Sequence, residues 1–151
     1  MDDGLNRFFS SLQMILEPQD TQALQHARTP LERCAIVEDL IEQCKLDDEW
    51  TIMCQSFLGN LYASGFDRKA HYEKARELLA LVIDSGKLDG EMQALCQGNL
   101  AGLYAEGLGG AVLKKEARVL LRQAFDSGDL DEEMCSEYEP LKNLLDESSE
   151  K

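Results

Sequence analysis

Two stretches of this chain decide its fold, because the second repeats the first at a distance of 42 residues. They are Cys54-Gln55-Ser56-Phe57-Leu58-Gly59-Asn60-Leu61-Tyr62-Ala63-Ser64-Gly65 and Cys96-Gln97-Gly98-Asn99-Leu100-Ala101-Gly102-Leu103-Tyr104-Ala105-Glu106-Gly107. Residues 84–92 and 126–134 agree at the same offset, and residues 42–50 agree one step earlier. Such a period is typical of stacked structural repeats. The sequence predicts units over 5–46, 47–88 and 89–130, a capping helix at 131–146 and a polar tail at 147–151.

Apolar residues within each unit follow the helical period. Ala75, Leu79 and Val82 lie on one stripe of a helix, and Ala117, Leu121 and Ala124 repeat that stripe one unit later. No stretch alternates apolar and polar residues as a half-buried strand would. We therefore predict an all-α protein with helices over 5–16, 31–43, 48–64, 69–85, 90–106, 113–127 and 131–146. A polar segment with Pro18 and Pro30 separates the first two, and Pro140 is expected to bend the last.

The joints between the predicted helices carry capping residues. Four glycines are placed to end helices: Gly65, Gly86, Gly107 and Gly128. Asp89 and Asp131 follow two of them at the position of an N-cap, where a carboxylate accepts from free backbone N–H groups. Cys44 replaces glycine at the first joint, which predicts a turn that is strained or differently shaped.

The repeated unit resembles a Sel1-like repeat, a longer-turned relative of the tetratricopeptide repeat. The residues that carry the resemblance are Leu58, Gly59, Leu61, Tyr62, Gly65, Lys74, Ala75, Ala80 and Gly86, and in the next unit Leu100, Tyr104, Gly107, Ala117, Ala124 and Gly128. Ala101 replaces the first glycine there and Glu116 replaces the lysine. The match covers residues 50–134, and 1–49 are degenerate. It implies a short α-solenoid of antiparallel helix pairs, in a single domain over 1–146.

Repeats of this family are generally scaffolds that bind proteins or peptides. By that resemblance the first helix of each pair lines a concave groove, which would contain Met53, Ser56, Asn60, Ser64, Leu95, Gly98, Gly102 and Glu106. The small residues could admit a helix or extended peptide with apolar anchors, or could serve only tight stacking of helices. Trp50 is either a wedge between repeats or, if exposed, a binding hot spot.

Charge narrows the class of partner. The 151 residues include 29 acids and 15 bases, for a net charge of −14, and both ends of the chain are acidic. Nucleic acid and an anionic membrane surface would be repelled, whereas a basic protein would be attracted. No apolar run has the length of a membrane span, and the acidic start Met1-Asp2-Asp3 is unlike a signal peptide.

No set of residues predicts an enzyme. The two histidines, His26 and His71, have no catalytic partner in a recognisable motif, and no Gly-rich loop is followed by the lysine of a phosphate site. The five cysteines are an odd number without metal-ligand spacing, which favours free thiols in the cytoplasm. We therefore expect no catalytic residue, no metal and no cofactor.

The expected function is that of a non-enzymatic adaptor or scaffold that binds another protein. Its partner would be basic or would present a helix with apolar anchors, and the acidic ends would steer it. One alternative is a dedicated chaperone or assembly factor for a secreted or unassembled client. A further alternative is a homo-oligomer formed through the ends of the repeat stack.

Overall fold

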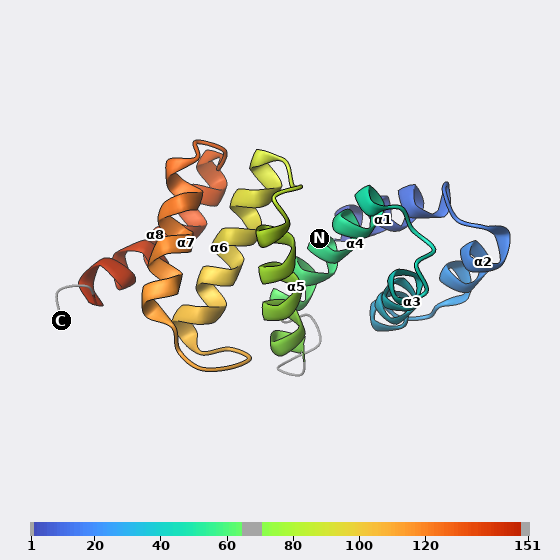
Figure 1. The fold of residues 1–151 in the computed structure, drawn as a ribbon, viewed down its shortest axis with the longest axis horizontal. Coiled ribbons are helices and arrows are strands. Elements are labelled where there is room, and N and C mark those ends of the chain that lie inside the picture. Colours follow the sequence, from blue (N-terminus) through green and yellow to red (C-terminus); the bar gives the residue numbers. More distant parts are fainter. Residues whose placement is uncertain (1, 65–70, 149–151) are drawn as a thin grey trace. The chain divides into compact units, whose positions relative to one another are not determined.

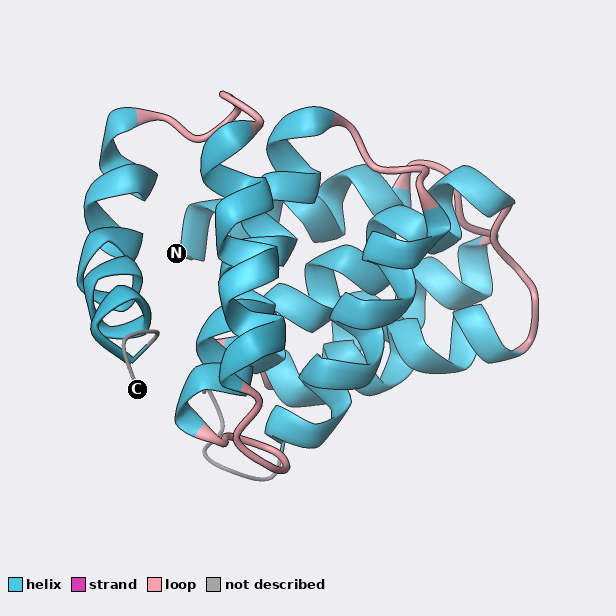
Figure 2. Ribbon diagram, turned by 60° about the vertical axis from the view of Figure 1, so that its left-hand side comes forward, coloured by secondary structure: helices cyan, strands magenta, loops and turns pink. Residues whose placement is uncertain are grey.

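A computed structural model describes residues 2–64 and 71–148, and the side chains of 7–64 and 71–146 (Figure 1). Regular structure in these ranges is helical, with no strand, which confirms the all-α prediction (Figure 2). The helices are α1 (Asp2–Gln13), α2 (Pro18–His26), α3 (Pro30–Glu42), α4 (Asp48–Ala63), α5 (Tyr72–Ser85), α6 (Gly90–Glu106), α7 (Lys114–Asp126) and α8 (Glu132–Ser148). Gly65, expected to end one helix, lies outside the described residues.

The chain divides into two compact units, Met1–Leu46 and Asp47–Lys151. The first contains α1, α2 and α3, and the second contains α4 to α8. Each unit is described by itself below. The single domain over 1–146 stays a prediction.

Helix α2 corrects the sequence prediction, which placed a polar segment over 17–30. Pro18 occupies the first turn of α2, where its missing N–H costs nothing and its fixed φ favours the helix. Leu24 is 1% exposed and anchors α2, which packs against both α1 and α3. One apolar residue in a polar stretch is too weak a periodic signal to predict a helix. A salt bridge of 3.2 Å between Lys45 and Asp20 also joins α2 to the end of α3.

The second unit is built from two helix pairs and a last helix. Helix α4 packs along α5, and α6 packs along α7. Helix α6 also contacts α4 and α5, and α8 contacts α6 and α7 in the same way (Figure 1). The bounds expected for α6, 90–106, are those observed, and α8 continues through Pro140.

Aspartates start the first helix of each pair and the last helix. The Oδ1 atoms of Asp47, Asp89 and Asp131 accept hydrogen bonds of 2.8 Å from the backbone N–H groups three residues later. The predicted caps Asp89 and Asp131 are confirmed, and Asp47 makes the third contact in the same register. Each such cap stabilises its helix by about 1 kcal/mol.

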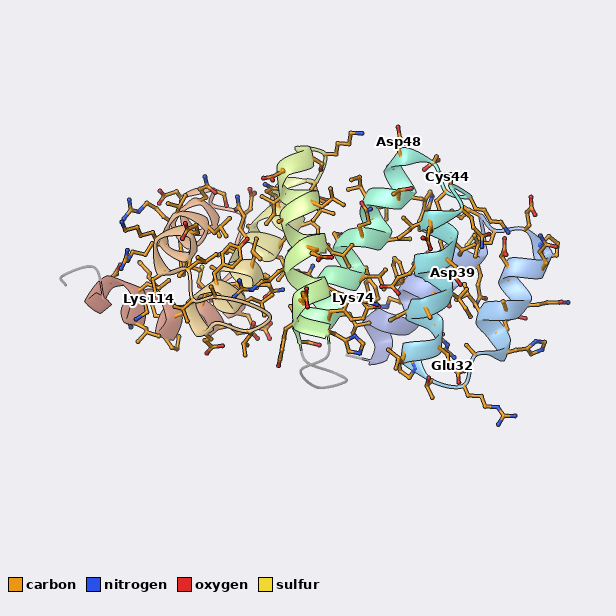
Figure 3. All side chains as sticks on the ribbon, turned by 60° about the horizontal axis from the view of Figure 1, so that its bottom comes forward. Glu32, Asp39, Cys44, Asp48, Lys74 and Lys114 are labelled. Carbon is orange, nitrogen blue, oxygen red and sulfur yellow. The ribbon has the colours of Figure 1, made fainter. Side chains whose placement is uncertain are left out.

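Left-handed residues end helices at the predicted joints. Gly86, Gly107 and Gly128 have φ of 68°, 70° and 75°. Cys44 has φ of 56° on the exposed turn after α3 (Figure 3). The first joint therefore has the conformation of the others, and the strain of a side chain in that conformation is about 1–2 kcal/mol. The prediction of strain is confirmed, and a different backbone conformation at this residue is not observed.

Replacing Cys44 by glycine is expected to stabilise the protein. The strain is removed, while the greater freedom of glycine in the unfolded chain offsets about half of the gain, so C44G should add about 0.5–1 kcal/mol. Urea unfolding of the whole chain measures the change. The reverse substitution Gly86→Ala is the matched control, because nothing lies within 4 Å of the added Cβ and only the backbone is affected. A loss of stability in C44G, or none in G86A, would contradict this account.

Candidate functional site

The predicted groove residues of α4 divide into exposed and buried positions. Met53 is 43% exposed, and Ser64 is exposed near the end of the helix. Ser56 is 2% exposed, and its hydroxyl donates to the Met53 carbonyl at 3.1 Å. Ser56 is therefore used within the helix packing and is not available to a partner. Trp50 is half-buried in the first turn of α4, where its backbone N–H donates to Asp47.

Asn60 belongs to a chain of hydrogen bonds that crosses three helices. Its Nδ2 donates to Cys96 Sγ at 3.5 Å, and its Oδ1 accepts from Asn99 Nδ2 at 2.8 Å. The Oδ1 of Asn99 accepts in turn from the Tyr138 hydroxyl at 2.7 Å. We call Asn60, Asn99 and Tyr138 the polar chain. It joins α4, α6 and α8, and nothing in the local sequence pattern indicated it.

Gly98 makes room for the Tyr138 ring. A Cβ built on Gly98 would lie 2.5 Å from Cζ of Tyr138, closer than any side chain could accept. The Tyr138 hydroxyl also lies 3.5 Å from the Leu95 carbonyl. Of the two interpretations of the small residues, tight helix packing therefore accounts for Gly98, as it does for Ser56.

An open hollow remains farther along α6 and contains the other two predicted residues. Gly102 lies in it, where an added Cβ would meet only Leu141 Cδ2 at 3.9 Å. The cavity measures about 230 Å³. We call it the α6–α8 hollow; its lining includes Ala63, Gly98, Asn99, Gly102, Leu103, Glu106, Leu108, Glu137, Tyr138 and Leu141. Glu106, the last predicted groove residue, is exposed in it.

The hollow combines an apolar interior with negative charge. Leu103, Tyr138 and Leu141 supply apolar surface around Gly102. Glu106 and Glu137 are exposed carboxylates in the lining. The arrangement suits an apolar group that carries a positive charge beside it.

Arg76 of α5 holds the edge of the hollow and was not singled out by the sequence. Its Nε donates to the Leu108 carbonyl at 2.7 Å, and Nη2 donates to the carbonyls of Leu103 and Ala111 at 3.0 and 2.8 Å. The guanidinium also covers the Tyr104 ring at 4.8 Å from its centroid. Because Leu103 and Leu108 line the hollow, the hydrogen bonds from Arg76 fix the position of part of its lining.

The contact between Arg76 and Leu103 recurs one unit later. Arg118 Nε donates to the Leu145 carbonyl at 3.0 Å, and both residues lie 42 positions after their counterparts. Each arginine links the second helix of a pair to the end of the next helix along. The signal was present in the sequence as an arginine that directly follows Ala75 and Ala117.

Replacing Arg76 by lysine should destabilise the protein by about 2 kcal/mol, because an ammonium group cannot reach three carbonyls in the fixed geometry of a guanidinium. Urea unfolding measures the change. The exposed Arg122 of the neighbouring helix is the control, since R122K makes the same chemical change on a solvated face. Equal effects of R76K and R122K would show that the three contacts do not stabilise the fold.

The two histidines are not among the lining residues of the hollow. His71 is buried and stacks on Tyr62 with ring centroids 4.8 Å apart, whereas His26 is exposed at the end of α2. Among the described residues, no three His, Cys, Asp or Glu side chains are grouped as metal ligands would be.

Burial makes two cysteines poor nucleophiles. It raises the pKa of Cys54 to about 12. It also raises the pKa of Cys96 to about 11, against the opposing effect of the hydrogen bond from Asn60. Burial, and to a smaller extent the charge of Glu137, raises the pKa of Tyr138 above its usual range. These three groups are neutral at physiological pH, and in that form Tyr138 belongs to the polar chain and Cys96 accepts from its Asn60.

Alkylation should therefore distinguish the cysteines. At pH 8 only about one in a thousand Cys96 thiols is ionised in the folded state, so iodoacetamide should modify exposed Cys44 first and Cys54 and Cys96 only after unfolding. Peptide mass spectrometry measures the order. Native labelling of Cys96 as fast as Cys44 would contradict the burial.

Burial of these thiols also predicts how stability depends on pH. Because unfolded thiols ionise above a pH of about 8.5 and the buried ones do not, the free energy of unfolding should fall as pH rises past that value.

Comparison of the chain with protein-family models, with curated proteins and with solved structures gives no match. Helices long and apolar enough to cross a bilayer are also absent from the part of the chain that the structure describes. The candidate site therefore stands on the geometry of the α6–α8 hollow.

Proposed function

We propose that this protein is a non-enzymatic helical-repeat module that binds a segment of another protein in the α6–α8 hollow. The observation that carries the proposal is the open space over Gly102, with Leu141 beside it and Glu106 and Glu137 in the same lining. The partner segment would place an apolar side chain over Gly102 and a lysine or arginine near the two carboxylates.

The proposal includes a short solenoid of Sel1-like or tetratricopeptide-like pairs. Three kinds of contact that recur at 42 residues support it: the aspartate caps, the left-handed joints and the arginine contacts to Leu103 and Leu145. Contacts that recur with the sequence period are what a stack of equivalent units requires.

The outer face of α8 supports a stack that ends there. The register relates Ala94 and Ala101 of α6, which are buried, to Ser136 and Asn143 of α8, which are exposed. A further helix pair would therefore meet polar side chains where α6 offers apolar ones to α7. This polarity disfavours a homo-oligomer built by extending the stack at this end.

The size of the hollow favours a peptide side chain over a cofactor. Sites for small molecules typically enclose about 300–1,000 Å³, and this hollow has a volume of about 230 Å³. A protein partner needs only one or two anchoring side chains at such a place, with the rest of its contacts spread over the surrounding surface.

Substitution of Gly102 tests the proposal. G102R fills the hollow and brings a positive charge to it, so it should lower recovery of a bound protein from native lysate by about tenfold. Quantitative mass spectrometry of the captured proteins measures the loss. Ser136→Arg, on the exposed outer face of α8, makes the same charge change outside the hollow and should leave recovery unchanged.

Two outcomes would reject this site. If G102R and S136R capture the same proteins equally well, the hollow is not the binding surface. If the captured proteins are unfolded clients of many sequences and G102R does not change them, the chain acts as a chaperone through another surface.

A further inference from the structure

A larger apolar groove lies between α5 and α7. Its volume is about 390 Å³, and we call it the α5–α7 groove. Leu100 and Tyr104 of α6 line it, with Ala80 and Ile83 from α5 and Val119 and Leu120 from α7. Val119 is 55% exposed and Leu100 is buried, so the groove runs from the core to solvent.

This groove is separate from the α6–α8 hollow. Successive residues of a helix are rotated by 100°, so Leu100 and Tyr104 point about 180° away from Gly98, Gly102 and Glu106. The two surfaces therefore use opposite sides of α6. A ligand of one does not depend on the other, and the inference below stands independently of the proposed function.

The apolar character of the groove is specific to this position in the chain. The register relates Ala80, Ile83 and Leu100 to Arg122, Phe125 and Lys142, which line the corresponding hollow between α7 and α8. Two of the three apolar positions become cationic there. The groove between α5 and α7 therefore keeps an apolar surface that its counterpart has lost.

The charges around the groove indicate the chemistry of its occupant. Asp84 of α5 and Glu116 of α7 lie in the lining, and exposed Glu77 lies one turn before Ala80 on the same face of α5. Lys115 is the one cation among the lining residues. Arg76 also reaches the Tyr104 ring, at 4.8 Å from its centroid, but its guanidinium donates to three backbone carbonyls. An apolar groove bordered mainly by carboxylates matches a ligand with apolar and basic groups side by side.

We infer that the α5–α7 groove docks an amphipathic helix of a partner protein, with apolar residues on one face and lysine or arginine beside them. Apolar side chains at helical spacing enter the groove over Leu100 and Tyr104. The basic side chains of the ligand lie along Glu77, Asp84 and Glu116. A helix that lies in a groove between two helices buries its apolar face without any change in the protein.

A synthetic peptide tests this inference directly on the full chain. The probe has about 18 residues, with leucine at helical spacing on one face and lysine elsewhere, and a matched peptide carries glutamate in place of lysine. Binding is measured by fluorescence anisotropy at about 0.15 M salt, where distant charges are screened. The bound site is identified by methyl NMR of the protein. The methyl signals of Ile83 and Val119 should shift, and those of Ala63 and Leu141 should not.

Ala80→Arg is the informative variant, because the counterpart Arg122 shows that the fold accepts arginine at this helix position. A80R should weaken binding of the lysine peptide by about tenfold, and S136R, with the same charge change, should not weaken it. Equal weakening by A80R and S136R, or equal binding of the glutamate peptide, would overturn the inference. Loss of binding in G102R but not in A80R would also overturn it and would place the peptide in the α6–α8 hollow instead.

Discussion

The polar chain of Asn60, Asn99 and Tyr138 is the constraint that sets the arrangement of the second unit. Polar side chains that are buried or half-buried need hydrogen-bond partners, and each of these finds one on a neighbouring helix. A shift of α8 by one turn would move the Tyr138 hydroxyl away from the side-chain Oδ1 of Asn99. It would also move the Tyr138 ring away from Gly98 and against another part of α6. The register that satisfies the chain also sets Leu141 beside Gly102 and so determines the shape of the hollow.

Local signals made much of the fold predictable. Asp89 and Gly107 mark the two ends of α6 by chemistry that acts within a few residues, so the bounds of this helix follow from the sequence alone. Helix α2 has no comparable signal, because Leu24 is its one buried residue and Pro18 is as compatible with a loop as with a first turn. Its existence depends on packing against α1 and α3, which a local pattern does not contain.

The candidate site was predictable in part, and for a non-local reason. Gly98 and Gly102 are both glycines on one face of α6, yet only Gly102 remains open, because Tyr138 covers Gly98. Tyr138 lies 42 residues after Cys96 and so has the same position in the sequence period. The side chain at this position is larger in α8, and the residue that it contacts, Gly98, has no side chain. That relation could have been read from the repeat alignment, but only with knowledge of which positions face each other across neighbouring units.

The acidity of the C-terminal region accompanies a polar, exposed face of α8. Residues 129–151 carry nine acids and two bases, and the outer face of α8 is polar at the positions where α6 is apolar. Exposed like charges in this region repel the same charges on a second copy and keep helix surface solvated. Most of these charges are therefore accounted for without a partner, and Glu137 differs from them because it lies in the hollow beside Tyr138. The acidic residues relevant to the proposed binding of a partner are those that lie next to apolar side chains, in the hollow and along the α5–α7 groove.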